Sequence, residues 1–302
     1  MLYNVNNSYF YYENPIYFIS DYYYSIVNLI IKILESHHLN INITLCNDYN
    51  FNNNNKTIKI DINYEHTLVK KEGRDIPFGT PFGEINEIDC IVNKYLVRIC
   101  NYNKLIKSNI IIDYTNPNIY NVKTCELYKS FSEKHIYISP SMYEPYFTKE
   151  NRNILSLTTF INILEPRRNA LLKTLNNEII HKNINNCFEK NKLQDILKNT
   201  KILINIHQTP HHNSFEELRV LPALECGVIV ISEISPLSET VPYHNLIIWT
   251  KYETIIDVVK EVIRNYDYYH DKLFSTENIN ILQQLPKYNY DLLDKTIKKM
   301  IV

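Results

Sequence analysis

The segment HQTPHHNSFEELRVLPALECGVIVISE, from His207 to Glu233, gathers three histidines, two adjacent glutamates and an arginine. Imidazole and guanidinium groups donate hydrogen bonds to polar ligands, and a guanidinium also balances negative charge. Zinc binding by His207, His211 and His212 is disfavoured, because Pro210 prevents a helical pair and no carboxylate or cysteine has a familiar ligand spacing. We therefore expect these histidines to hydrogen-bond a polar ligand, with plain exposure in a loop as the alternative.

Local signals predict how this segment folds. Ser214 followed by Glu217 is the pattern of a helix capping box, so a helix should begin at Phe215. Pro222 lies inside that helix and should kink or split it, at a cost of about 3 kcal/mol. Gly227 suits the left-handed residue that ends a helix, and the apolar run VIVIS after it predicts a buried parallel strand.

The place of the loop QTPHHNS favours ligand binding. It follows the expected strand KILINIH, and open α/β sheets bind ligands at the carboxyl ends of their strands. The helix start beyond the loop would offer free N–H groups to an anion such as a phosphate. Glu217 is either a ligand contact or only the helix cap, and Arg219 is either a ligand contact or half of a surface ion pair.

A second candidate site lies at Arg167 and Arg168, which open a helix just after the expected strand NILSLTTF. Two cations at a helix start oppose the helix dipole unless an anion is nearby. One interpretation is a solvated pair offset by Glu165. We favour a diphosphate clamp, because each guanidinium can donate two hydrogen bonds to a phosphate.

A third polar cluster is the loop EHTLVKKEGRDIPFGTPFGE, which holds three of the four glycines in the chain. It follows the expected strand TIKIDINY, again at a carboxyl end, and it includes His66, Arg74 and Asp75. So many glycines in a glycine-poor chain indicate a flexible or tightly turned segment. The alternative is a long ordinary surface loop.

The elements that must position these residues alternate between strands and helices of ten or more residues, which indicates parallel α/β architecture. There are two such series, and 302 residues exceed one ordinary core. We expect an α/β fold of two Rossmann-like parallel-sheet domains facing across a cleft. Their bounds would be 1–145 and 146–285, with a closing helix over 286–302 that is compatible with crossing back to the first domain.

Composition excludes several classes of protein. The net charge of −1 argues against nucleic-acid binding, and no apolar window is long enough for a membrane span. The N-terminal segment lacks the pattern of a signal peptide, and the six scattered cysteines suit buried thiols in a reducing compartment. We therefore expect a cytoplasmic protein. The bias toward Asn, Ile, Lys and Tyr suits an A+T-rich genome, such as that of a large DNA virus, a parasite or an endosymbiont. If the chain is viral, the expected location is the host cytoplasm.

The stretches INIHQTPHHNSFEELRVLPALECGVIVISE and LSLTTFINILEPRRNALLKTL resemble the donor-binding half of glycosyltransferases with the GT-B fold. YEHTLVKKEGRD and YLVRICNYNKLIKSNIIIDYTNPNIYNV resemble the other half of related sequences from bacterial and giant-virus glycan clusters. The resemblance covers roughly residues 58–275. It implies transfer of a sugar from a UDP- or GDP-linked donor, held by the second domain, to a glycan or protein-linked acceptor at the first.

The resemblance also implies roles for particular residues. An arginine at 167 or 168 would meet the leaving diphosphate. Apart from the resemblance, we expect the catalytic residues to be His66, Glu65 and Arg74. His66 or Glu65 would act as the acceptor base or hydrogen-bond the sugar, since a histidine titrates near the working pH. Many members carry two glutamates eight positions apart, as are Glu217 and Glu225, but alignment on Cys-Gly puts Pro222 at the second acid. The expected donor-binding residues are Arg167, Arg168, His207, His211, His212, Ser214, Phe215, Glu216, Glu217 and Arg219.

No Asp-x-Asp pair occurs in the chain, so we expect no metal, and Arg, Lys and helix N-termini would balance the diphosphate charge. Two other interpretations stay open: another nucleotide-sugar enzyme of this fold, such as an epimerase or hydrolase, or a non-catalytic glycan- or nucleotide-binding protein. Sugar, base, anomeric outcome and oligomeric state do not follow from the sequence.

Overall fold

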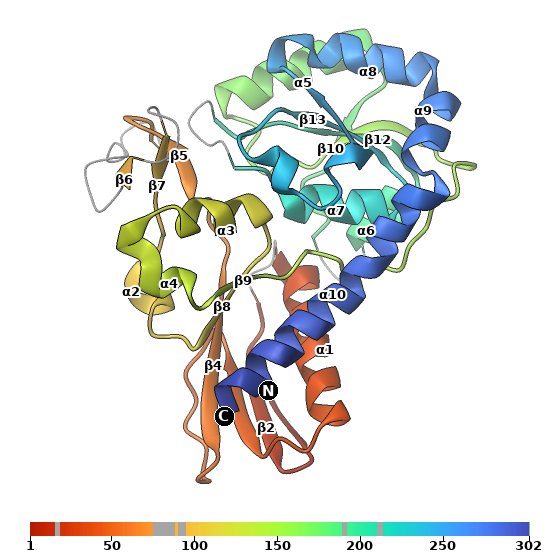
Figure 1. Cartoon of the computed structure of the whole chain (residues 1–302). Coiled ribbons are helices and arrows are strands. Elements are labelled where there is room, and N and C mark those ends of the chain that lie inside the picture. The colour runs from red at the N-terminus through yellow and green to blue at the C-terminus, as the bar shows by residue number, and fades with distance from the viewer. Residues whose placement is uncertain (16–18, 75–87, 90–94, 189–191, 210–213, 302) are drawn as a thin grey trace.

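The computed structural model describes residues 1–15, 19–74, 88–89, 95–188, 192–209 and 214–301. Two α/β domains, each with its own sheet, face each other, and a long C-terminal helix runs from one to the other (Figure 1). The predicted fold class is therefore confirmed. None of the described helices combines the length and apolarity that crossing a membrane requires.

The first domain is built on a six-stranded sheet in the order β1-β2-β3-β4-β8-β9, parallel throughout except for the β1–β2 hairpin. The strands are β1 Leu2–Val5, β2 Ser8–Tyr12, β3 Ile41–Leu45, β4 Lys56–Asn63, β8 Ile110–Asp113 and β9 His135–Tyr137. Helix α1 (Ser20–Ser36) covers one face, and its apolar stripe joins the strand side chains in one core. The other face carries α2 (Tyr102–Leu105), α3 (Asn116–Lys123) and α4 (Lys129–Ser132).

Three short strands of the first domain lie outside the main sheet. β7 (Tyr95–Val97) pairs antiparallel with β5 (Leu68–Lys70) and β6 (Ile88–Asp89) in a separate small sheet. Because β4 pairs directly with β8, the main sheet has no open position between them for β7. The small sheet extends beyond the carboxyl ends of the main strands (Figure 1).

The second domain has a fully parallel sheet in the order β11-β10-β12-β13-β14. Its strands are β10 Ile154–Thr158, β11 Lys182–Asn183, β12 Thr200–Asn205, β13 Ile229–Glu233 and β14 Ile247–Thr250. Helices α5 (Pro166–Glu178) and α8 (Ile255–Arg264) cover the outer face, whereas α6 (Lys192–Lys198) and α7 (Glu217–Glu225) lie on the side of the first domain (Figure 1). The loops at the carboxyl ends of this sheet therefore meet those of the first.

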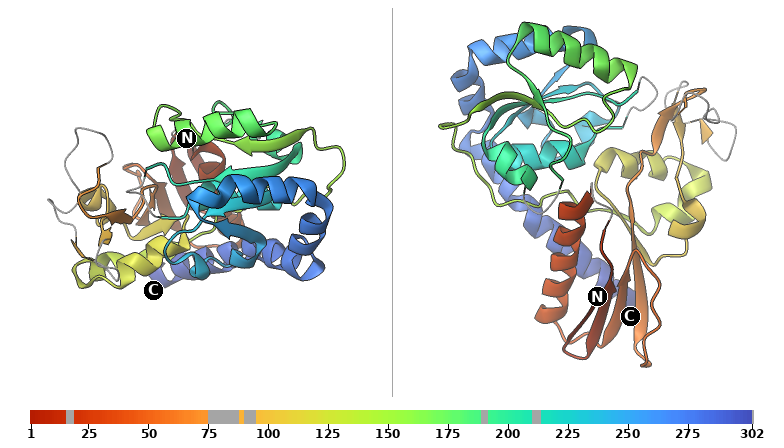
Figure 2. Two further views of the ribbon diagram at one scale, coloured as in Figure 1. Left: turned by 90° about the horizontal axis from the view of Figure 1, so that it is seen from above. Right: turned by 180° about the vertical axis from the view of Figure 1, so that it is seen from behind.

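The chain closes through α9 (Tyr266–Leu273) and the 26-residue α10 (Thr276–Ile301). Leu282 and Leu285, near the start of α10, belong to the core of the second domain, whereas Leu293 and Ile297 are buried in the first. Between them, the buried Asn289 bonds the Oγ and both backbone polar groups of Ser139. The view from behind shows both chain ends on the first domain (Figure 2).

The two helices that face the candidate site begin differently. Pro166 opens α5, and the carboxylate of Glu165 accepts from the backbone N–H groups of Arg167 and Arg168. The predicted capping box of α7 is wrong: the helix begins at Glu217 rather than Phe215. The side chains of Ser214 and Glu217 bind the first domain instead of each other.

Gly227 ends α7 as predicted, with φ +66°. A Cβ there would lie 2.7 Å from the carbonyl oxygen of Tyr146 and 2.9 Å from the Cα of Phe147. Both the left-handed backbone and this close approach require glycine. Pro222 lies inside α7 without splitting it.

Candidate functional site

A cavity of about 540 Å³ lies between the domains, at the carboxyl ends of both sheets. Its first-domain wall includes Glu65 and His66, which follow β4, and Tyr114, which follows β8. Its second-domain wall includes side chains from the end of β12, from the loops after β10 and β12, and from the starts of α5 and α7: Thr159, Arg168, Asn205, His207, Gln208, Ser214, Glu216 and Arg219. This volume suits a small-molecule ligand held between two rigid domains.

The second-domain wall is cationic. The guanidinium of Arg168 lies 4.5 Å from the ring centroid of Phe160, and that of Arg219 lies 5.7 Å from the same ring. Arg168 is 5% exposed, and its Nε has no hydrogen-bond partner among the described residues. Burial, reinforced by the repulsion of Arg219, lowers the pKa of Arg168 to about 9. An anion in the cavity would offset both the burial of the Arg168 charge and its repulsion by Arg219.

Arg219 is held in place by side chains from two neighbouring strands. Its Nε donates to Thr159 Oγ1 at 3.1 Å, and its Nη1 donates to Asn205 Oδ1 at 2.8 Å. Both acceptors are neutral, so they orient the guanidinium without cancelling its charge. The cavity therefore holds two oriented cations above one aromatic ring.

His66 and Glu216 face each other across the domain boundary. His66 Nε2 lies 3.5 Å from Glu216 Oε2, and both side chains are mostly buried. Burial opposes ionisation of Glu216, but His66, Arg219 and a hydrogen bond with Tyr114 outweigh it, so the pKa of Glu216 lies below its usual value. Glu216 is thus an anion between the two arginines and the histidine.

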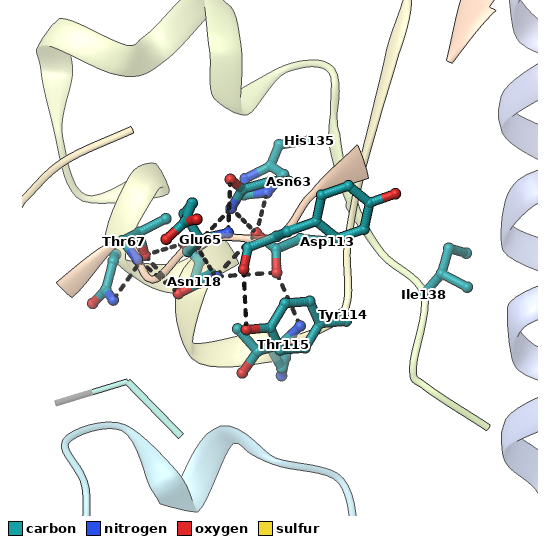
Figure 3. A network of polar contacts seen from close by, with 12 residues as sticks. Asn63, Glu65, Thr67, Asp113, Tyr114, Thr115, Asn118, His135 and Ile138 are labelled. Atoms are coloured by element: carbon teal, nitrogen blue, oxygen red, sulfur yellow. Dashed lines mark hydrogen bonds and ion pairs between the residues drawn. The ribbon is translucent and has the colours of Figure 1, made fainter. Parts of the chain in front are cut away.

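A buried polar network supports the segment that carries Glu65 and His66. Its centre is Asp113, at the end of β8, whose carboxylate accepts from Asn63 Nδ2 at 2.7 Å and lies 2.9 Å from His135 Nε2 (Figure 3). Asn118 Nδ2 donates to Asp113 and to the backbone oxygen of Glu65. These bonds fix the backbone below the first-domain wall of the cavity.

The segments on the two walls are also bonded directly to each other. Leu68 N donates to Ser214 Oγ at 3.3 Å, and Asn116 N donates to Glu217 Oε1 at 2.7 Å. Glu217 also accepts from Thr115 Oγ1, Tyr137 and Tyr243. Burial raises the pKa of Glu217 to about 7, although these hydrogen bonds oppose the shift.

Three residues expected to bind a donor do not line the cavity. Glu217 is fully buried with its oxygens occupied by the bonds above, and Phe215 is fully buried with its ring 4.8 Å from that of Trp249. Arg167 is bound in an ion pair with Glu233 and lies 4.0 Å from the ring centroid of Tyr252. Each has a partner that is distant in sequence and that holds its side chain outside the cavity lining.

The remaining expected residues divide as follows. His207, Ser214, Glu216, Arg168 and Arg219 line the cavity, as do Glu65 and His66. Arg74 is exposed and is not part of that lining. His211 and His212 lie outside the described residues, as does Asp75.

Glu225 is also withdrawn from the cavity. Its carboxylate accepts from Ser141 Oγ and from the backbone N–H groups of Met142 and Tyr143, in the segment that joins the domains. Burial raises the pKa of Glu225 to about 7, although those three hydrogen bonds oppose the shift. Neither member of the Glu217–Glu225 pair is therefore available to a ligand.

A second cavity of about 360 Å³ opens on the first domain alone. It shares Ile19, Tyr64 and Glu65 with the interdomain cavity, so the two adjoin at these residues. Its other walls carry four amides, two acids, a tyrosine and a lysine: Asn14, Asn47, Asn63, Asn101, Glu13, Asp61, Tyr23 and Lys104. Such side chains suit a ligand with many hydroxyl groups.

Sequence reasoning misses several residues of the site. It treats Phe160, Thr159 and Asn205 only as parts of strands, and it does not single out Asp113. A signal does exist for Asp113 and Asn205, because each is a polar residue at the carboxyl end of an apolar strand. Phe160 gives no such signal, since a strand-end phenylalanine usually belongs to a core.

Comparison with known proteins gives distant similarities. No protein-family model matches the chain. The uncharacterized protein R358 of Acanthamoeba polyphaga mimivirus is 29% identical over 169 residues, which are 54% of this chain and 56% of that protein. The crystal structure of TarM aligns with a TM-score of 0.48 and 10% identity, over 84% of this chain and 54% of that one.

The structure of accessory secretory proteins 1, 2 and 3 of Streptococcus pneumoniae aligns with a TM-score of 0.46 and 8% identity, over 91% of this chain and 57% of the matched one. The chain thus spans little more than half the length of the mimivirus protein, of TarM and of the matched Streptococcus pneumoniae chain.

Proposed function

We propose that this protein is a glycosyltransferase that moves a sugar from a nucleoside-diphosphate donor to a hydroxyl acceptor in the interdomain cavity. The observation that carries the proposal is the pair of arginines over Phe160. Arg168 is almost fully buried with no described hydrogen-bond partner for its Nε, and Arg219 is held beside it by neutral groups. A buried cation costs free energy unless an anion compensates it.

The donor chemistry follows from that charge. As the bond between the sugar and the diphosphate breaks, negative charge builds on the diphosphate. Arg168 and Arg219 supply preorganised positive charge there, a role that a metal ion has in other transferases. The absence of an Asp-x-Asp pair in the sequence agrees with this assignment. We propose a UDP- or GDP-linked donor and metal-independent transfer.

The second cavity supports transfer rather than hydrolysis or epimerisation. It meets the first at Glu65 and Tyr64 and has polar walls of its own. A hydrolase needs only water, and an epimerase needs no second substrate. We propose that the acceptor enters from this side and that its acceptor groups are sugar hydroxyls.

Donor binding is tested by a thermal-shift screen with UDP, GDP, CMP and their sugars. A ligand at about 100 times its Kd adds roughly 2.7 kcal/mol to stability. Arg168→Met and Arg219→Met should each weaken binding about tenfold or more, because a hydrogen bond to a charged group contributes about 1.5–3 kcal/mol. Arg264→Met, on the exposed end of α8, should bind like the unmodified protein.

Turnover separates the remaining alternatives. Release of the nucleoside diphosphate only when a glycan acceptor is added supports transfer. Equal release without acceptor supports a hydrolase, and binding without release under any acceptor supports a binding protein. Failure of every nucleotide to shift the melting temperature would reject the donor site itself.

A further inference from the structure

The pairing of His66 with Glu216 joins residues that are 150 positions apart and belong to different domains. Their Nε2 and Oε2 atoms are 3.5 Å apart, and both side chains line the interdomain cavity. A surface ion pair at this separation would mean little. Here the side chains are 19% and 25% exposed, so solvent screens the pair only in part.

The backbone on each side of the pair is held by bonds that cross the same boundary. Two residues beyond His66, Leu68 N donates to Ser214 Oγ, which lies two residues before Glu216. One residue beyond Glu216, the carboxylate of Glu217 accepts from Asn116 N and Thr115 Oγ1. The pair therefore lies between two fixed points rather than at the end of mobile loops.

The first-domain side is supported from below as well. Thr67 N donates to Asn118 Oδ1 at 3.1 Å, and Asn118 Nδ2 donates to the backbone oxygen of Glu65. Asn118 is in turn bonded to Asp113, the centre of the buried network (Figure 3). Both neighbours of His66 in the chain are thus anchored, which limits the directions its ring can take.

Resting on the proposed function, we infer that Glu216 is a positioning residue for His66, so that the catalytic base is assembled from both domains. The ring nitrogen of His66 that does not face Glu216 takes the proton of the acceptor hydroxyl while that oxygen bonds to the anomeric carbon. The electron pair of the breaking sugar–oxygen bond leaves with the diphosphate toward Arg168 and Arg219. Glu216 holds the imidazole in place and stabilises the positive charge that the proton brings to it.

Other charges around the pair explain why a carboxylate is needed at this point. Arg219 and Arg168 are close enough to Glu216 to affect its ionisation, and they would oppose a second cation nearby. Glu65, the chain neighbour of His66, lines the same cavity, and so do the neutral hydroxyls of Tyr64 and Tyr114. Without Glu216, an imidazolium at His66 would face two guanidiniums across the cavity.

The inference is tested by following the imidazole of His66 with NMR during a pH titration, in protein without any nucleotide. A His66→Asn variant assigns the signal. In Glu216→Gln the titration midpoint of His66 should fall by about one pH unit, because the imidazolium loses its anionic neighbour while both arginines stay. Glu216→Asp keeps the charge at a greater distance and should give an intermediate midpoint.

Glu178→Gln is the matched control, since Glu178 lies at the end of α5 in an exposed pair with Lys260. It should leave the titration of His66 unchanged. A midpoint in Glu216→Gln equal to that of the unmodified protein would overturn the inference. Because no nucleotide is present, that outcome would leave the donor site to be judged by the thermal-shift screen alone.

Kinetics supply the second readout. With a donor that the screen identifies, kcat of Glu216→Gln should fall about 10- to 100-fold, because general bases contribute about 10²–10⁴-fold to rate. The acid limb of its pH profile should move to lower pH, and Glu216→Asp should recover part of the rate. A change in KM alone, with kcat and the pH profile intact, would contradict a positioning role.

Discussion

Arg167 and Arg168 are neighbours in sequence with opposite surroundings. One residue along a helix turns a side chain by about 100°. That step directs Arg167 to Glu233 and to the ring of Tyr252, whereas Arg168 enters the cavity with no ion pair to a described carboxylate. The sequence predicted both as members of one clamp, because nothing in it showed which arginine Glu233 would reach.

This difference predicts opposite effects of one substitution on stability. Arg167→Met should lower the free energy of unfolding by about 1–3 kcal/mol, because it leaves the half-buried Glu233 without its cation. Arg168→Met should keep or raise that free energy, since it removes a buried charge whose desolvation outweighs its attraction to Glu216 and Glu165. Urea denaturation of both variants without ligand measures the effect, and equal destabilisation would contradict the assignment.

Helix α7 is the element that joins the two walls of the site. The sequence predicted a helix here and its end at Gly227, but placed its start two residues early. The error has a physical cause: Ser214 and Glu217 carry the right types and spacing to cap a helix, yet each finds a partner in the first domain. Such partners lie about a hundred residues away or more, so local pattern cannot reveal them.

Glu217 and Glu225 on this helix predict how stability depends on pH. Burial raises the pKa of each from an ordinary value of 4.5 to about 7, so the folded protein binds more protons than the unfolded chain between these values. Their contribution to stability is therefore full below about pH 4.5, declines as pH rises to 7, and is constant above it.

Glu217→Gln isolates one of these groups. A glutamine keeps one oxygen for Thr115 and Asn116, and its amide can donate to the hydroxyls of Tyr137 and Tyr243. The variant should match the unmodified protein at pH 5 and be more stable at pH 8, whereas Glu217→Ala should be less stable at both. Denaturant titrations at the two pH values measure these stabilities. A Glu217→Gln variant that is less stable than the unmodified protein at pH 8 would contradict the predicted direction of the pH dependence.

At the scale of the whole molecule, the sequence predicted two parallel-sheet α/β domains, and the structure has them. The alternation of apolar strands with amphipathic helices carries that information, as in NIIIDY and the residues of α1. It could not give the separate sheet of β5, β6 and β7, nor the adjoining second cavity. These depend on contacts between segments far apart in the chain, such as the direct pairing of β4 with β8.

The central claim is that the second-domain wall of the interdomain cavity receives a nucleoside diphosphate on Arg168 and Arg219. Isothermal titration calorimetry with UDP and GDP tests it most directly, using the unmodified protein, Arg168→Met and the Arg264→Met control. The account predicts saturable binding of at least one nucleotide to the unmodified protein and the control, and binding at least about tenfold weaker to Arg168→Met. Equal affinity in all three proteins, or no binding of either nucleotide to the unmodified protein, would contradict it.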